Sequence, residues 1–295
     1  MIPHAGETFA VLSGVFWAIA VCLFKRGGAE MPPITLNLFK NIIGVILFAI
    51  TLPIVGQPLF IDVPLWDYAI IILSGVIGMT VGDTLFFAAL NRMGASLWAI
   101  VSSLYSPSVI VMAYFFLGER LSWPGLLGIT IIVGAIVLAS ARRDELGRFD
   151  KSCLIGILLG ISSLLLLAIG IIMMKPVLDR TPVWWVIQVR LIGSMLSLLV
   201  LVLLSKRRWF LLKAMLPHRN WKFIIPGSII GPYLALGFWI AGFKYTLAGK
   251  AAILNQLNVI FIFFFAWLFL KEPLTWRRSL GLGLALVGAS LVIFY

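Results

Sequence analysis

The stretches LGERLSWPGLLG (117–128) and LKEPLTWRRSLG (270–281) are two copies of one segment, 153 residues apart. Six of the twelve aligned positions are identical, and they include a glutamate and a tryptophan. The register continues upstream, where the identical pairs are Ala95/Ala248, Ala99/Ala252, Ile100/Ile253, Leu104/Leu257, Ala113/Ala266 and Phe116/Phe269. Composition alone can produce leucine matches, but it does not readily produce Glu and Trp in register. The chain therefore contains an internal repeat, with its two copies 153 residues apart.

The composition shows whether this repeat faces water or lipid. Of the 295 residues, 62% are hydrophobic and 12% are charged, and the mean hydropathy is +1.10. Soluble domains are about 45–50% apolar and about 25% charged. Because a soluble domain of this size cannot bury so much apolar surface, most of the chain must face lipid. The net charge of +12 gathers in short gaps such as 141–151 and 205–222, which is typical of membrane loops and excludes nucleic acid as a partner.

Apolar runs of about 20 residues can cross the bilayer as helices. The sequence has ten: 8–25, 33–54, 67–90, 94–117, 122–140, 152–174, 183–204, 221–243, 249–270 and 274–294. We therefore predict an all-α membrane protein with ten transmembrane helices, five in residues 1–145 and five in residues 146–295. An odd number of spans per half inverts the second half, so the prediction is two inverted five-helix repeats. Transporters of this design bind substrate near the midplane.

A second repeated feature is the entry to the second and seventh spans. With one-residue gaps, MPPITLNLFKNIIG (31–44) aligns with RTPVWWVIQVRLIG (180–193) and places Lys40 opposite Arg190. These entries, the GERLSW and KEPLTW turns and the five-plus-five spans resemble the EamA-type transporters of the drug/metabolite transporter superfamily. The resemblance covers nearly the whole chain. It implies a secondary transporter and points to no single substrate.

The loop charges predict an orientation. Gaps on the side of the N-terminus (side one) hold five Lys and Arg residues, and gaps on the other side (side two) hold sixteen. The positive-inside rule then places side two in the cytoplasm and both termini outside. The resemblance implies both termini inside, and we follow the charge count because it is a property of this chain. The expected location is a bacterial or archaeal cytoplasmic membrane.

Two cations and one acid lie well inside predicted spans. Lys40 is about 12 Å deep at 1.5 Å per residue, and Arg190 approaches the midplane from the opposite surface. Each costs about 2.5–3.5 kcal/mol to insert. They could snorkel or form a structural ion pair, or they could bind an anionic or zwitterionic substrate together. Asp83 could be the counter-ion of either cation, or it could couple transport to a proton, since a desolvated carboxylate can load and unload one.

Polar and aromatic side chains on nearby spans are further candidates for substrate binding. They are Trp17, Asn37, Asn41, Tyr105, Gln188, Asn255 and Asn258. Asn37 and Asn41 share a helix face, as do Asn255 and Asn258. Hydrogen bonding between helices explains such residues equally well. We interpret Glu119 and Glu272, at the repeated turns, as structural.

The alternative function is a membrane-embedded enzyme acting on a lipid or isoprenoid substrate. The sequence has no HExxH, no paired-Asp metal motif and no histidine within a span. It has no Walker P-loop either, so ATP-driven pumping by this chain has no support. We expect no cofactor and no metal, and the expected partners are a small-molecule substrate, the lipid bilayer and a proton. Cys22 and Cys153 have no framework spacing and are interpreted as inert buried thiols.

Overall fold

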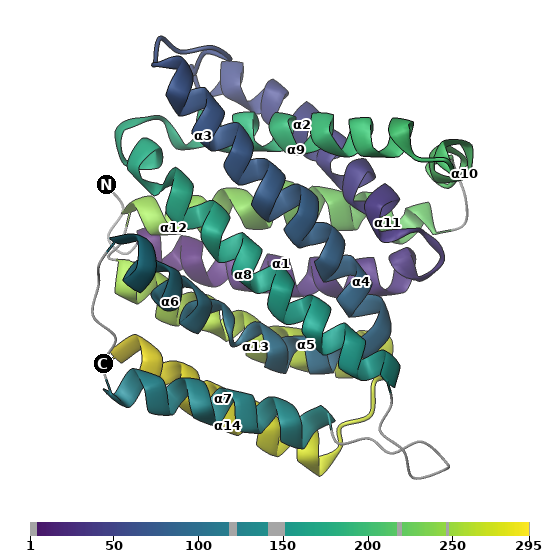
Figure 1. Cartoon of the computed structure of the whole chain (residues 1–295), viewed down its shortest axis with the longest axis vertical. Coiled ribbons are helices and arrows are strands. Elements are labelled where there is room, and N and C mark those ends of the chain that lie inside the picture. Colours follow the sequence, from purple (N-terminus) through teal and green to yellow (C-terminus); the bar gives the residue numbers. More distant parts are fainter. Residues whose placement is uncertain (1–4, 118–122, 141–150, 217–219, 246–247, 295) are drawn as a thin grey trace.

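The computed structural model describes residues 5–117, 123–140, 151–216, 220–245 and 248–294. Throughout these ranges the regular elements are helices and there is no strand, so the predicted all-α class is confirmed (Figure 1). Six helical rods are long and apolar enough to cross a membrane: Gly6–Glu30, Pro33–Ile54, Leu65–Met93, Lys151–Arg180, Val183–Leu204 and Trp221–Gly242. Two shorter apolar helices are Trp123–Ala139 and Leu257–Leu270. The chain is an integral membrane protein.

The long helices follow one another in a similar order in both halves. The first half contains α1 (Ala5–Gly27), η1 (Gly28–Glu30), α2 (Pro33–Ile54), α3 (Leu65–Gly75), η2 (Val76–Gly82), α4 (Asp83–Met93), α5 (Ala95–Ser102), α6 (Tyr105–Leu117) and α7 (Trp123–Ser140). The second contains α8 (Lys151–Arg180), α9 (Val183–Leu204), α10 (Arg208–Lys213), α11 (Trp221–Ile229), η3 (Ile230–Ala235), α12 (Leu236–Tyr245), α13 (Ala248–Leu270) and α14 (Trp276–Phe294). Each π-helical segment, η2 and η3, joins two α-helices into one rod.

Three predicted boundaries are corrected by the structure. The run 94–117 is divided into α5 and α6, because Pro107 has no N–H and its ring crowds the carbonyl four residues earlier, at Ser103. The run 152–174 continues as a helix to Arg180, and an exposed ion pair between Lys175 and Asp179 supports its last turns weakly. The gap after α9 contains the short helix α10, which we did not predict.

The burial pattern of α9 repeats that of α2 with a shift of 150 residues. Buried α2 positions and their α9 equivalents are Leu36/Val186, Lys40/Arg190, Gly44/Ser194, Phe48/Leu198 and Leu52/Val202. Both helices begin directly after a proline, whose fixed φ favours a helix start. The burial pattern of the two helices therefore supports the alignment of Lys40 with Arg190.

Helices at equivalent positions cross in opposite directions. Asn41 of α2 donates a hydrogen bond to Ser194 of α9 over 2.8 Å, and Gly44 packs on Leu191. Residues further along α2 contact residues earlier in α9, so α2 and α9 are antiparallel. Figure 1 shows the equivalent pair α7 and α14 side by side, and they are antiparallel as well: their contacts are Gly128 with Gly288 and Ala139 with Gly281.

Glu272 links the two halves at side two. Its carboxylate accepts hydrogen bonds from the backbone amides of Ala95 (2.8 Å) and Ser96 (3.0 Å), the first residues of α5. Gly94 precedes them at φ +81°, and a Cβ there would lie 2.9 Å from the carboxylate. Arg278 is 3.6 Å from the same carboxylate. Glu272 is thus a structural cap, as expected, whereas Glu119 lies outside the described residues.

This cap predicts a loss of stability in Glu272→Ala. The change leaves two amide groups at the start of α5 without an acceptor, so we expect the free energy of unfolding to fall by about 1–2 kcal/mol. Thermal unfolding in detergent measures the loss as a lower apparent Tm. Asp62→Asn, an exposed acid in the α2–α3 loop, is the charge-matched control and should leave the Tm unchanged. An equal effect of both variants would contradict the cap.

Candidate functional site

The partly buried acid Asp83 pairs with Lys40. Lys40 lies on α2 and Asp83 is the first residue of α4, directly after the π-helical segment. Their charged atoms are 2.8 Å apart, and the side chains are 5% and 17% exposed, respectively. Lys40 also donates a hydrogen bond to the Asn41 side chain over 2.9 Å. Of the two cations that Asp83 could neutralise, the structure selects Lys40.

The π-helical segment η2 explains the position of Asn37. The side-chain amide of Asn37 donates to the backbone carbonyls of Met79 (2.7 Å) and Thr80 (3.2 Å). A π-helix disturbs the regular hydrogen-bond ladder, and a free carbonyl in a membrane is costly. Asn37 therefore stabilises the irregular turn that presents Asp83 to Lys40.

A polar chain connects this turn to the second half. Asn41 donates to Ser194, and the Thr80 hydroxyl donates to the Ser194 hydroxyl over 3.0 Å and lies 2.6 Å from that of Ser197. Our reading of the sequence missed Thr80, Ser194 and Ser197. Ser194 could have been noticed as a hydroxyl within an apolar run, at the position equivalent to Gly44.

Arg190 is buried without an ion pair among the described residues. It is 3% exposed, and its Nη1 contacts the sulfur of Met174 at 3.1 Å, which is a weak acceptor. Its Nε and Nη2 have no hydrogen-bond partner in the described part of the chain. Gly78 leaves room for the guanidinium, because a Cβ at that position would lie 3.2 Å from Nη2. Asp83 and Tyr105 are within electrostatic range of Arg190.

The other predicted residues divide into two groups. Tyr105 of α6 packs on Trp239, with ring centroids 6.4 Å apart, and Trp17 of α1 packs on Phe86 at 5.7 Å. The Trp17 contact joins α1 to α4, the helix that carries Asp83, and the Tyr105 contact joins α6 to α12. The remaining three, Gln188, Asn255 and Asn258, are not joined to it by any hydrogen bond between described residues.

Two of those three have unsatisfied buried atoms. The Gln188 amide donates to the carbonyl of Val45 over 3.3 Å, but its Oε1 has no described partner. The Nδ2 of Asn255, on α13, likewise has no partner within the described ranges. Asn258 packs against Gly14 of α1 and is half-buried. Buried polar atoms without partners are uncommon, so Gln188 and Asn255 stay candidates for ligand contact.

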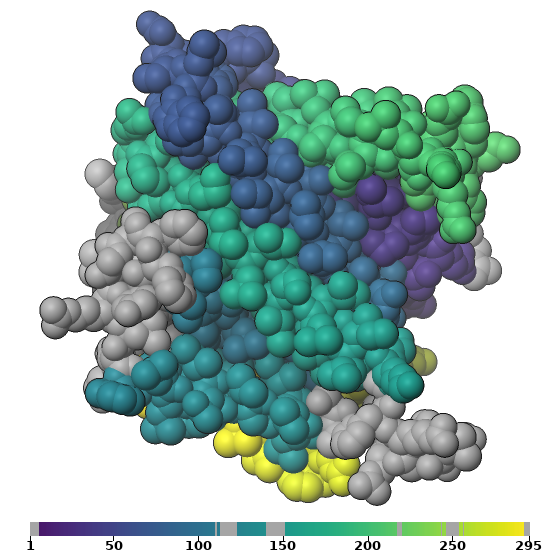
Figure 2. Space-filling model, viewed as in Figure 1, coloured from purple at the N-terminus to yellow at the C-terminus, as the bar shows by residue number. Residues whose placement is uncertain are grey.

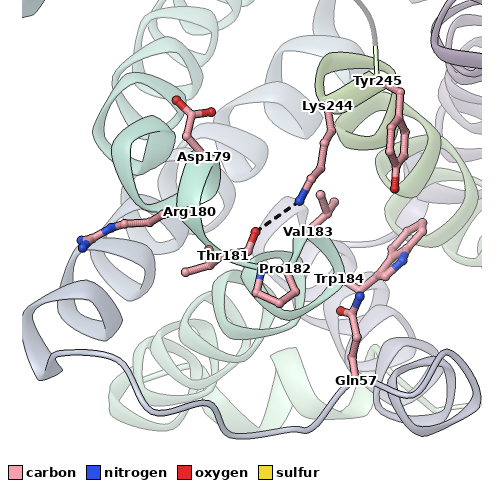
Figure 3. A pocket seen from close by; sticks show the side chains of 9 residues that line it. All are labelled: Gln57, Asp179, Arg180, Thr181, Pro182, Val183, Trp184, Lys244 and Tyr245. Carbon is pink, nitrogen blue, oxygen red and sulfur yellow. Dashed lines mark hydrogen bonds between the residues drawn. The ribbon is translucent and has the colours of Figure 1, made fainter.

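A cavity of about 420 Å³ lies at the side-one end of the bundle (Figure 3). It is lined by Gln57, Asp179, Arg180, Thr181, Pro182, Val183, Trp184, Lys244 and Tyr245. Figure 3 shows Lys244 donating to the Thr181 carbonyl, over 3.4 Å. Trp184 lies six residues before Arg190, about 9 Å along α9. The cavity therefore opens beyond the end of the helix that carries Arg190, and not between Lys40 and Arg190.

Comparisons with known proteins give a consistent result. The profile of the EamA-like transporter family matches residues 4–141 and again residues 154–294. An uncharacterized transporter of Archaeoglobus fulgidus is 22% identical over 96% of both chains. An uncharacterized protein of Methanocaldococcus jannaschii is 32% identical over 43% of this chain and 85% of its own length. A solved crystal structure has a TM-score of 0.68 over 97% of this chain and 95% of that chain, at 16% identity, which shows a shared fold.

Proposed function

Because this chain belongs to the EamA-like transporter family and is a membrane transporter, we propose that it is a secondary transporter for a small anionic or zwitterionic metabolite, such as an amino acid or an organic acid. The observation that carries the proposal is the Arg190 guanidinium, which is buried and has two nitrogen atoms without a partner among described residues. The substrate site lies around Arg190 and Asp83.

The charge of the site favours an acidic group on the substrate. Asp83 already neutralises Lys40, so the positive charge of Arg190 is left over. A charge at membrane depth is costly, and a carboxylate or phosphate is its natural partner. The planar guanidinium can hold either group with two parallel hydrogen bonds. A zwitterion could place its acid on Arg190 and its ammonium near Asp83, which is 17% exposed.

The remaining candidates have supporting roles in this proposal. Lys40 keeps Asp83 in place, Asn37 holds the turn that carries Asp83, and Asn41 accepts a hydrogen bond from Lys40. Tyr105 and Trp17 provide aromatic walls. Gln188, Asn255 and Asn258 bind polar groups of the substrate, and the free atoms of Gln188 and Asn255 support this assignment.

Transport proceeds by alternating access between two inverted five-helix repeats, residues 1–145 and 146–295, with ten membrane crossings. Support comes from the antiparallel α2–α9 and α7–α14 pairs and from the equivalent π-helical segments η2 and η3. The M. jannaschii relative, about half as long as this chain, supports one repeat as a unit. The halves rock about the shared site. The loop charges support both termini outside a bacterial or archaeal cytoplasmic membrane.

A two-stage experiment tests the proposed function. Purified protein is first screened with amino acids, organic acids, sugar phosphates and amines for a rise in apparent Tm, because a bound ligand stabilises the native state by mass action. Compounds that raise the Tm are then tested for flux into liposomes that contain the protein. We expect uptake of at least one acid and none of amines without an acidic group. Uptake of only cationic compounds would refute the anion site.

A further inference from the structure

The short helix α10 lies across the side-two end of the bundle. Figure 1 shows that it turns sharply away from α9, which it follows. Leu211 attaches it to the bundle: the side chain is buried among Leu38, Leu198 and Val202, and its carbonyl accepts a hydrogen bond from Thr35 over 3.4 Å. If α9 crosses the membrane, α10 lies along the membrane surface.

The outward face of α10 combines aromatic rings with cations. Trp209 is 68% exposed and Phe210 is 61% exposed. Lys206, Arg207, Arg208 and Lys213 are exposed beside them, and the Arg208 guanidinium lies 5.9 Å from the Trp209 ring centroid. No described carboxylate forms an ion pair with any of the four cations. Figure 2 shows this segment projecting at one corner of the molecule (green, upper right).

The repeat shows that the fold does not require this surface. The equivalent linker of the first half, residues 55–64, carries Asp62 and no lysine or arginine. Both linkers connect the second and third rods of their halves. Exposed aromatic rings occur at both linkers, since Phe60 and Trp66 in the first half are 81% and 73% exposed. The cations on and beside α10 are therefore the separate property of the second half, and a binding partner explains their combination with the rings better than packing does.

We propose that the α10 surface, formed by Lys206, Arg207, Arg208, Trp209, Phe210 and Lys213, binds the headgroups of anionic phospholipids in the side-two leaflet. Guanidinium groups pair with phosphate, and clustered cations beside a membrane helix attract anionic lipid. Tryptophan and phenylalanine insert at the level of the headgroups. A soluble phosphate would use the cations but would leave both rings in water, so the rings favour a lipid.

The test compares lipid binding by the full chain and two double variants. Native mass spectrometry and the apparent Tm are measured while phosphatidylglycerol or phosphatidylcholine is added to the protein in detergent. Arg207→Gln/Arg208→Gln removes two charges from the α10 surface. Lys151→Gln/Lys271→Gln removes two exposed charges from the same side, away from α10. We expect the first variant to lower the phosphatidylglycerol affinity about tenfold or more, and the second to retain it.

Each other result would count against the proposal. Equal losses in both variants would mean that net charge binds the lipid and α10 does not. Equal binding of phosphatidylcholine would remove the role of anionic headgroups. If inorganic phosphate at the same concentration produced the same Tm rise, and Trp209→Ala/Phe210→Ala changed nothing, the ligand would be free phosphate and not lipid. The readout is lipid binding, so it does not depend on the transported substrate.

Discussion

Replacing Arg190 with glutamine is expected to abolish ligand-induced stabilisation and at the same time to raise the stability of the empty protein. Arg190 is 3% exposed and has no ion pair with a described residue, so it costs free energy in the absence of substrate. Glutamine removes that cost. It also removes the bidentate partner of the substrate acid, so the affinity should fall at least tenfold, about 1.4 kcal/mol.

The measurement is the apparent Tm of the Arg190→Gln variant with and without the acid found in the screen. Arg190→Lys tests the geometry, because it keeps the charge and loses the planar fork, and it should recover only part of the affinity. Arg92→Gln, an exposed arginine on α4, is the matched control and should behave like the wild type. A lower Tm for Arg190→Gln with unchanged ligand binding would show that Arg190 has a structural role.

The helical fold could be predicted from the sequence because it depends on the apolar composition and on the length of the apolar runs. Lipid-facing helices need apolar residues over their whole length, and such runs can be read directly. The local breaks were harder to predict. Pro107 signals the division of α5 from α6. The π-helical segment before Asp83 depends on Asn37, which binds the carbonyls of Met79 and Thr80 from 42 and 43 residues away.

The sequence indicated which charged residues lie within helices and are wholly or partly buried, but it did not indicate how they pair. The depth of Lys40, Asp83 and Arg190 follows from their positions in the runs. Which cation meets Asp83 depends on how the rods pack, and no single run contains that information. The choice matters, because it leaves Arg190, and not Lys40, as the cation without a described partner. The prediction that the two cations bind the substrate together is accordingly proposed here with Arg190 as the direct contact.

Removing either member of the Lys40–Asp83 pair should destabilise the protein strongly, and removing both should not. Asp83→Asn leaves a lysine that is 5% exposed without its counter-ion, and Lys40→Met leaves the carboxylate alone. Breaking a buried pair in this way costs about 3–5 kcal/mol, whereas replacing both members with neutral residues of similar size is often neutral. Unfolding in SDS of the two single variants and the double variant gives the coupling energy. Single losses that simply add would disprove the pair.

The same double variant, Lys40→Met/Asp83→Asn, separates the structural role of Asp83 from a role in proton coupling. Its fold should be intact, so any change in transport is due to the missing charges of the pair and not to instability. If Asp83 carries the coupling proton, uptake driven by a pH gradient should be lost while exchange of substrate across the membrane continues, since exchange needs no net proton movement. The acid on Arg190 would still bind, because Arg190 is unchanged. Uptake that still follows the pH gradient in the double variant would exclude Asp83 as the proton carrier and leave it as the counter-ion of Lys40.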